Sequence, residues 1–251
     1  MTAFPEDIKS YFWSYLKLVI KVVLAQPGRI VSHLRDAFRY YRPWKNSFTH
    51  EGSPLVHRIP WLPFACQDFI GRSIGPESVV FEFGSGGSTL YFLGRVKHLV
   101  SVEHDEDWYA TVKSLLDEEE ISNGEYYLEV PSPDPVRSDT DPCPLGYEDG
   151  GYPGMTFYDY ASKIDAYEDS SFDLVVVDGR ARNACLWHAR GKLKPGGYLV
   201  LDNAEREGYR PGMKLIEKWP SREFFGILPY VRGFCKTVIW KKPHGDLRDD
   251  A

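Results

Sequence analysis

A glycine-rich turn at residues 84–88 is the part of the sequence best suited to binding a ligand. It follows the apolar run 79–83, whose composition is typical of a strand buried on both faces. The glycines allow a tight turn and a close approach to a ligand, and a helix expected after them presents free N–H groups. We therefore predict a binding site here, formed by Glu82, Gly84, Ser85, Gly86, Gly87 and Ser88.

An acidic residue, Glu103, ends the next predicted strand, about 20 residues after the turn. In Rossmann-type folds a carboxylate at this place accepts hydrogen bonds from the hydroxyls of a ribose. His104 follows, and an adenine could pack on its ring. The turn and the acid together predict a cofactor that contains a nucleoside.

The spacing of the glycines argues against NAD. A dinucleotide fingerprint would have its third glycine at position 89, which is Thr89. The pattern E-x-G-x-G-x-S-T from Glu82, with an acid after the second strand, resembles motif I and its partner in class I S-adenosylmethionine-dependent methyltransferases. The resemblance implies S-adenosylmethionine as cofactor. It places Glu82, Gly84 and Gly86 at the methionine part, Glu103 at the ribose and Asp178 at the junction with the substrate.

Two more strand ends carry oxygen-bearing side chains, Asp178 and the pair Asp202-Asn203. This is the pattern of metal-dependent O-methyltransferases of the catechol and caffeoyl-CoA type. The resemblance implies Mg²⁺ held by all three residues, with Asp178 and Asp202 catalytic. Those enzymes have a lysine base three residues after the first aspartate, where this chain has Ala181. In the alternative interpretation Asp178 contacts the sulfonium or the substrate, and Asp202-Asn203 caps the following loop.

The segment from about residue 78 to 241 is also similar to a bacterial family of class I methyltransferases, often encoded among genes for surface polysaccharide or glycoconjugate assembly. The matching stretches are F-E-F-G-S-G-G-S-T-L at 81–90, V-S-V-E-H-D-E-D-W-Y at 100–109, V-D-G-R-A-R at 177–182, L-K-P-G-G-Y-L-V-L-D-N at 193–203 and T-V-I-W-K-K at 237–242. The resemblance implies O-methylation of a small molecule, a sugar or a glycoconjugate. Arg180 and Arg182 suit an anionic acceptor.

Strand and helix patterns alternate along the chain and position these residues. We expect an α/β, Rossmann-like, doubly wound and mostly parallel sheet, with an antiparallel C-terminal edge hairpin and an N-terminal helical extension. The long loop 131–156 carries aromatic residues that could close over the cofactor. Expected strands are 78–83, 98–102, 125–130, 172–177, 198–201, 224–228 and 236–240, and expected helices include 87–94, 106–118, 184–192 and 213–219. The expected domains are a basic amphipathic helical segment at 1–45, a methyltransferase domain at 46–245 and a polar tail at 246–251.

Composition limits the partners and the compartment. The formal net charge of −6 over 251 residues provides no overall basic field, so no nucleic acid is expected. The four cysteines show no metal-binding spacing, and no cleavable signal peptide is evident, which favours a cytoplasmic protein with reduced thiols.

The N-terminal run 11–24 is aromatic and apolar, with Lys17 and Lys21 on one helical face. It is too short and too charged to span a membrane, but it could lie at the inner face of one as a peripheral contact. Packing on the domain or a homodimer contact is the alternative.

Two other functions remain open from the sequence. One is a non-catalytic Rossmann-like scaffold that associates with a membrane or a partner through its N-terminal helix. The other is an NAD(P)-dependent oxidoreductase. The leading prediction is an S-adenosylmethionine-dependent methyltransferase.

Overall fold

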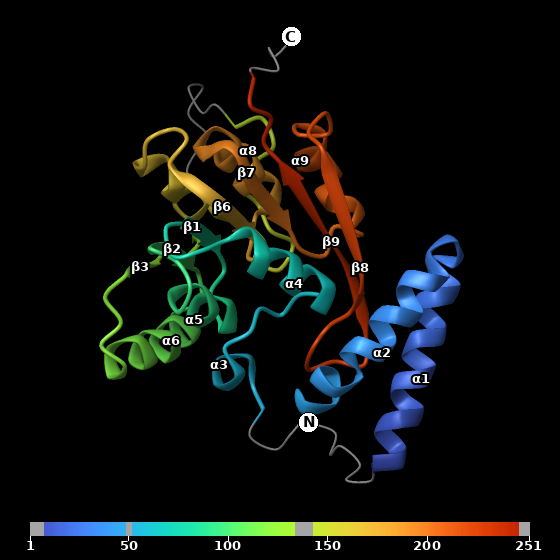
Figure 1. Cartoon of the computed structure of the whole chain (residues 1–251). Coiled ribbons are helices and arrows are strands. Elements are labelled where there is room, and N and C mark those ends of the chain that lie inside the picture. Colours follow the sequence, from blue (N-terminus) through green and yellow to red (C-terminus); the bar gives the residue numbers. More distant parts are fainter. Residues whose placement is uncertain (1–7, 49–51, 134–142, 246–251) are drawn as a thin grey trace.

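The computed structural model describes residues 8–48, 52–133 and 143–245 and is built around one seven-stranded sheet (Figure 1). The strand order is β3-β2-β1-β6-β7-β9-β8, and only the pairs of β9 with β7 and with β8 are antiparallel. The strands are β1 (Val79–Phe83), β2 (His98–Glu103), β3 (Gly124–Leu128), β6 (Phe172–Val177), β7 (Leu193–Leu201), β8 (Ser221–Ile227) and β9 (Phe234–Lys241). The chain reverses its winding direction between β1 and β6, so this is the point where ligands bind in open α/β sheets.

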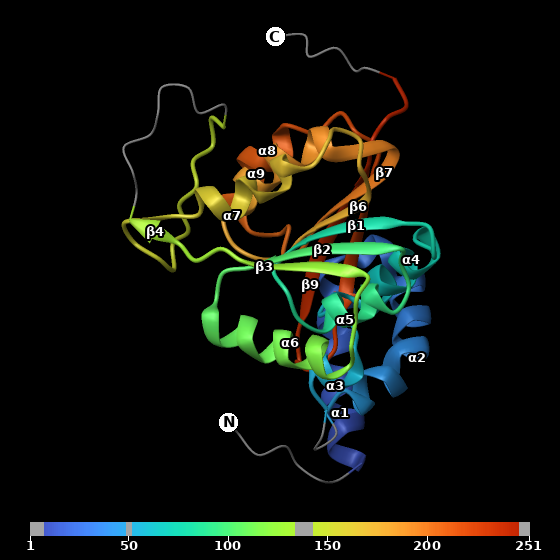
Figure 2. The ribbon, with the colours of Figure 1, turned by 90° about the vertical axis from the view of Figure 1, so that its left-hand side faces the viewer.

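Helices cover both faces of the sheet (Figure 2). One face carries α4 (Phe64–Ser73), α5 (Gly87–Leu93) and α6 (Glu106–Glu118), and the other carries α7 (Tyr158–Ser162), α8 (Arg182–Lys192) and α9 (Arg210–Lys214). The short helix α3 (Pro54–His57) contacts α5. A two-stranded sheet of β4 (Ser132–Pro133) and β5 (Met155–Thr156) lies in the long connection between β3 and β6.

Side chains of the central strands alternate between two cores, one under each helical layer. On β1, Phe81 and Phe83 pack into the core beneath α7 and α8, whereas Val80 packs into the core beneath α4, α5 and α6. All three are fully buried. Because successive strand residues point to opposite faces, a strand covered on both sides must be apolar throughout. Glu82 is the exception on β1, and its neighbours are described below.

The predicted fold class is confirmed, including the antiparallel C-terminal hairpin. The details differ at three places. The expected helix 213–219 lies earlier, at Arg210–Lys214. Strand β7 begins at Leu193, earlier than the expected strand 198–201, and its register with β6 shifts between Phe172 and Leu174. In the C-terminal hairpin only β8 is at the sheet edge, because β9 inserts between β7 and β8.

The N-terminal extension consists of two helices, α1 (Ile8–Ala25) and α2 (Ile30–Asn46), joined by a 3-10 turn at Pro27–Arg29. They lie side by side next to β8 (Figure 1). In the described part of the chain, no helix is long and apolar enough to cross a membrane. The expected polar tail at 246–251 lies outside the described residues.

Gly87, the first residue of α5, is required by a backbone contact. A Cβ atom there would lie 2.2 Å from the carbonyl oxygen of Pro54 and 2.6 Å from that of Ile59. Neither backbone can move without shifting α3 away from α5. We expect Gly87→Ala to lower the free energy of unfolding by about 1–3 kcal/mol in urea denaturation.

Gly75→Ala is the matched control, because a Cβ on Gly75 would meet nothing within 4 Å. Equal losses in the two variants would contradict a steric origin.

Candidate active site

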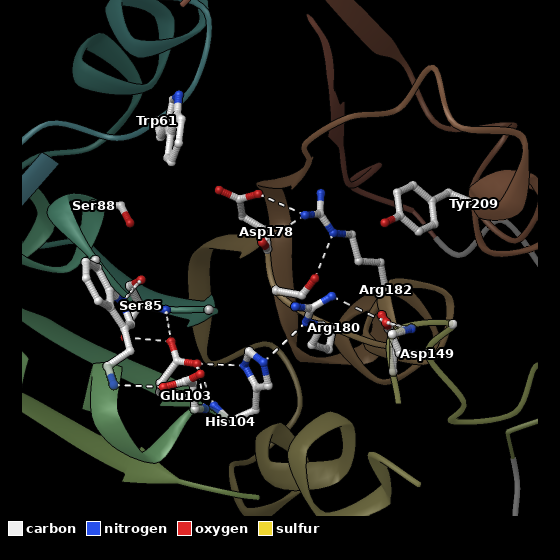
Figure 3. A pocket seen from close by; sticks show the side chains of 18 of the residues that line it. Trp61, Ser85, Ser88, Glu103, His104, Asp149, Asp178, Arg180, Arg182 and Tyr209 are labelled. Atoms are coloured by element: carbon white, nitrogen blue, oxygen red, sulfur yellow. Dashed lines mark hydrogen bonds and ion pairs between the residues drawn. The ribbon is translucent and has the colours of Figure 1, made fainter. Parts of the chain in front are cut away.

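A cavity of about 1260 Å³ opens at the carboxyl ends of β1, β2 and β6, at the switch point of the sheet (Figure 3). Its walls come from the glycine turn, from the residues that follow β2 and β6, and from two later loops. Of the predicted site residues, Gly84, Ser85, Gly86, Gly87, Ser88, Glu103, His104 and Asp178 line it.

The turn itself depends on one glycine with left-handed geometry. Gly84 has φ +90°, and a Cβ there would lie 2.9 Å from both the Cα and the N of Gly179. Because only glycine permits this approach, the ends of β1 and β6 come together beneath the cavity. Thr89 then secures the turn by accepting a hydrogen bond from Gly86 N at 2.9 Å.

Glu103 anchors the opposite wall with an ionised carboxylate. Its Oε2 accepts hydrogen bonds from the amide and the hydroxyl of Ser85, and its Oε1 accepts from the amides of His104 and Asp105 (Figure 3). Burial alone would raise the pKa of Glu103. The nearby His104 ring and these amides outweigh it and lower the pKa to about 2. The carboxylate therefore carries its charge across the physiological pH range.

His104 and Arg180 extend the chain of polar contacts across the cavity wall. His104 Nδ1 lies 2.7 Å from Glu103 Oε1, and Arg180 Nε donates to His104 Nε2 at 3.2 Å. Arg180 also faces Asp149, with 3.4 Å between Nη1 and Oδ1. The His104 ring contacts Tyr152 with its edge, at 5.7 Å between centroids.

Glu82 lies behind the glycine turn and is not part of the cavity lining. Its Oε2 accepts hydrogen bonds from the hydroxyls of Thr89 and Ser101, at 2.7 and 2.9 Å. The structure thus corrects the prediction that Glu82 lines the site. Its side chain points into the core under α5, where it accepts the hydrogen bond of Thr89, the residue that secures the turn. Burial raises the pKa of Glu82 to about 7, and the charge of Glu103 adds to the rise.

This shift makes stability depend on pH. Folded protein keeps the Glu82 proton up to about pH 7, whereas the unfolded chain releases it near the ordinary value of 4.5. Native stability therefore falls as pH rises between these values. In Glu82→Gln the free energy of unfolding, relative to the native protein, should rise by about 2 kcal/mol from about pH 5 to about pH 8. Urea melts at the two pH values test this, and a pH-independent difference would contradict it.

Asp178 and Arg182 form a half-buried ion pair at the end of β6. Arg182 Nη2 donates to Asp178 Oδ1 at 3.1 Å and to its backbone oxygen at 2.9 Å. Burial raises the pKa of Asp178, and the charge of nearby Asp202 adds to the rise. The Asp178 side chain is 32% exposed and faces the cavity, whereas Arg182 is 7% exposed (Figure 3).

All three guanidinium nitrogens of Arg182 donate to groups of the chain itself. Besides Asp178, it donates to the backbone oxygens of Gly179 at 2.9 Å and Asp202 at 2.6 Å. The expectation that Arg182 suits an anionic acceptor is therefore wrong, because its guanidinium holds the ends of β6 and β7 together.

The predicted magnesium ligands do not share the cavity, although Asp202 is close enough to Asp178 for its charge to raise the pKa of Asp178. Asp202 is buried, accepts a hydrogen bond from the Thr237 hydroxyl at 2.5 Å, and is not part of the cavity lining. Asn203 is absent from the lining as well. Over residues 8–48, 52–133 and 143–245, no three His, Cys, Asp or Glu side chains gather to hold a metal ion. The structure therefore gives no support to Mg²⁺ or to a catalytic role for Asp202.

Several lining residues were missed by sequence reasoning. Trp108 on α6 donates its indole N–H to Ser85 O at 2.9 Å and lines the cavity beside the turn. Arg206 and Tyr209 line it from segments far away in the sequence, where no pattern marked them. Trp108 carried a signal, because it lies in the first turn of the helix expected just after Glu103. Trp61, in the proline-rich segment before the first strand, lines the cavity as well.

The aromatic residues of the long loop are mostly core residues. Tyr147 in the loop, Phe157 just after it and Tyr160 within α7 are buried in the core on the α7 and α8 side of the sheet, so they cannot close over a ligand. Instead the cavity wall is formed by residues 145–146 and 148–151 of the loop. Residues 134–142 of the same loop lie outside the described part of the chain.

The sheet order and the position of the cavity define the fold of class I S-adenosylmethionine-dependent methyltransferases. A solved structure with this fold is the O-methyltransferase from Bacillus cereus in complex with S-adenosylhomocysteine. It matches with a TM-score of 0.52 and 15% identity, over 96% of this chain and 93% of that chain. A methyltransferase-like protein from Silicibacter pomeroyi has 21% identity over 74% of this chain and 93% of that chain, with a TM-score of 0.44. No family model and no curated protein matches the sequence.

Proposed function

We propose that the chain is an S-adenosylmethionine-dependent methyltransferase whose cofactor binds in the cavity between the glycine turn and Asp178. The observation that carries this proposal is the ionised Glu103 carboxylate, held by three backbone amides at the end of β2, opposite the turn. A carboxylate there suits a ribose diol. Because Gly84 and Gly179 have no side chains, they approach each other closely and leave the space above the turn open to a ligand.

The charges of the cavity also fit this cofactor. Bound S-adenosylmethionine would supply a methyl group on a sulfonium, which is a cation. Glu103 and Asp178 contribute carboxylates on two sides of the cavity, and both residues line it. A positive cofactor would favour the ionised form of Asp178 and so oppose the effect of its burial.

We assign Asp178 the role of proton acceptor for a hydroxyl of the acceptor. One carboxylate oxygen is paired with Arg182, which leaves the other available to the cavity. Its raised pKa suits a general base better than an ordinary aspartate does. Asp178 would accept the proton that the acceptor hydroxyl gives up when its oxygen receives the methyl group from S-adenosylmethionine.

The acceptor is proposed to be a small molecule or the sugar of a glycoconjugate, bound at the end of the cavity away from Glu103. That end is lined by Arg180, Arg206 and Tyr209 and by the loop residues 145–151 except Tyr147. Arg180 is 40% exposed and Arg206 is exposed, so both can donate to a polar or anionic acceptor. O-methylation of such a hydroxyl is the reaction that this arrangement favours.

Calorimetric titration with S-adenosylmethionine, S-adenosylhomocysteine and NADH tests the cofactor. We expect micromolar binding of the first two and none of NADH, with quenching of the fluorescence of Trp61 or Trp108, which line the cavity. Loss of the quench in Trp108→Phe or Trp61→Phe, with binding retained, would locate the ligand. Binding of NADH alone would overturn the proposal.

A further inference from the structure

The helices α1 and α2 form a hairpin whose inner face packs on the domain. Tyr15, Leu18 and Val22 of α1 and Trp44 of α2 share a buried cluster with Ile227 of β8. Trp44 Nε1 also donates to the backbone oxygen of Val231 at 3.0 Å. The hairpin is therefore held in a fixed orientation, and its outer face points away from the domain (Figures 1 and 2).

That outer face is apolar and exposed. Phe38 is 91% exposed, Val31 80% and Leu24 73%, which is unusual for side chains of this size. Of the fourteen large apolar side chains exposed in the described part of the chain, nine belong to this hairpin. Together they are called the hairpin face: Phe12, Trp13, Leu16, Ile20, Leu24, Ile30, Val31, Leu34 and Phe38. Such a concentration marks an interaction surface.

Basic residues border this face on both sides. At 100° per residue, the hairpin-face residues of each helix fall within a sector of about 120°. Five basic residues occupy the next sector, whereas Lys9 and Lys45, near the ends of the hairpin, fall by their positions in the direction of the apolar sector. The two helices run antiparallel. Each contacts the other along one edge of its apolar sector, where the ring centroids of Phe12 and Tyr41 are 6.2 Å apart. The apolar sectors are therefore adjacent, with lysines at one outer margin and arginines at the other. These basic residues are Lys17 and Lys21 on α1, and Arg35, Arg39 and Arg42 on α2.

The hairpin is strongly positive although the chain is negative. Residues 8–46 contain eight lysines and arginines and a single acid, Asp36, while the whole chain carries −6. If two copies joined through this face, they would bring two positively charged surfaces together, which opposes a symmetric dimer. An anionic lipid surface satisfies the charge and the apolar side chains at once.

We propose that the hairpin face docks the protein on a membrane that contains anionic lipids, with α1 and α2 lying in the plane of the interface. Phe12, Leu16 and Phe38 would enter the boundary between headgroups and acyl chains, and Trp13 would lie at the headgroup level. Of the basic margins, Lys17, Lys21 and Arg42 would contact lipid phosphates. Arg39 pairs instead with Asp68 at 2.7 Å, and Arg35 lies 3.5 Å from Asp36. This docking is independent of the proposed catalytic activity.

Flotation of the full chain with phosphatidylcholine vesicles, with and without about one third phosphatidylglycerol, tests the proposal. We expect binding to the anionic vesicles that weakens with added salt, and little binding to the neutral ones. Phe38→Asp combined with Val31→Asp should weaken partitioning by more than about tenfold. Lys17→Glu with Lys21→Glu should weaken it and reduce its salt dependence.

Val56→Asp is the matched control, because Val56 is 61% exposed but lies outside the hairpin. It should bind vesicles like the native chain, and circular dichroism melts of all variants should confirm that they are folded. Equal binding to neutral and anionic vesicles, or no binding, would overturn the proposal. A dimer in solution that Phe38→Asp dissociates would also overturn it, because the face would then belong to a second copy.

Discussion

Replacing Glu103 with glutamine should weaken the binding of S-adenosylmethionine more than about 100-fold, the largest effect on binding that we expect from a single atom exchange. Hydrogen bonds to a charged group contribute about 1.5–3 kcal/mol each, and a ribose diol would donate two to this carboxylate. Calorimetric titration measures the change. Thermal melts with and without cofactor provide a second readout, since only a chain that binds should gain stability.

The contacts of Glu103 indicate which group the ribose would displace. Oε1 accepts from two amides and has the His104 ring 2.7 Å away, whereas Oε2 accepts from the amide and the hydroxyl of Ser85. Of the two donors on Oε2, the hydroxyl is the one that can rotate away. That hydroxyl lies 2.7 Å from the hydroxyl of Tyr126, which offers it another partner. Ser85→Ala should therefore bind cofactor nearly as well as the native chain. If Ser85→Ala lost binding as fully as Glu103→Gln, the carboxylate would not be the ribose anchor.

The largest loss of stability should come from replacing Arg182 with methionine. The side chain is buried, and its guanidinium donates to three backbone oxygens and to the Asp178 carboxylate. Methionine fills the volume but leaves these acceptors without donors. Each buried acceptor left without its donor costs about 1–3 kcal/mol, so urea denaturation should show a total loss of about 3–5 kcal/mol.

Arg180→Met is the matched control, two residues away in the same segment. Arg180 is 40% exposed and faces Asp149 at 3.4 Å, an arrangement that contributes no more than about 1 kcal/mol. Similar losses in both variants would mean that removal of a positive charge lowers the stability, and not loss of the hydrogen bonds that Arg182 makes to the strand ends.

The order of strands and helices, the glycine turn and Glu103 could be read from the sequence. Each depends on residues that are close in the chain: an apolar run, then glycines, then a helix, then a second strand ending in an acid. Parallel strands that alternate with helices place their carboxyl ends at one edge of the sheet, so the site near Gly84 and Glu103 followed from the order of elements. The cofactor class then followed from glycine spacing and from family resemblance.

Side-chain direction and long-range contact could not be read in this way. A strand covered on both faces is apolar on both, so its pattern does not reveal which face Glu82 takes, and Glu82 points into the core away from the cavity. Asp202 ends its strand as Asp178 does, yet it is buried against Thr237, a partner 35 residues away. For this reason only Asp178, of the three predicted magnesium ligands, lines the cavity.

The sequence by itself determined the fold class and the glycine turn that lines the cavity, because these depend on local patterns along the chain. Tertiary structure alone decided three other features: that Arg182 holds strand ends, that loop aromatics form core, and that α1 and α2 place nine apolar side chains on one outer face. Each of these depends on which groups far apart in the chain come within contact distance. Residue types and spacing do not specify such contacts until packing has fixed the orientation of every element.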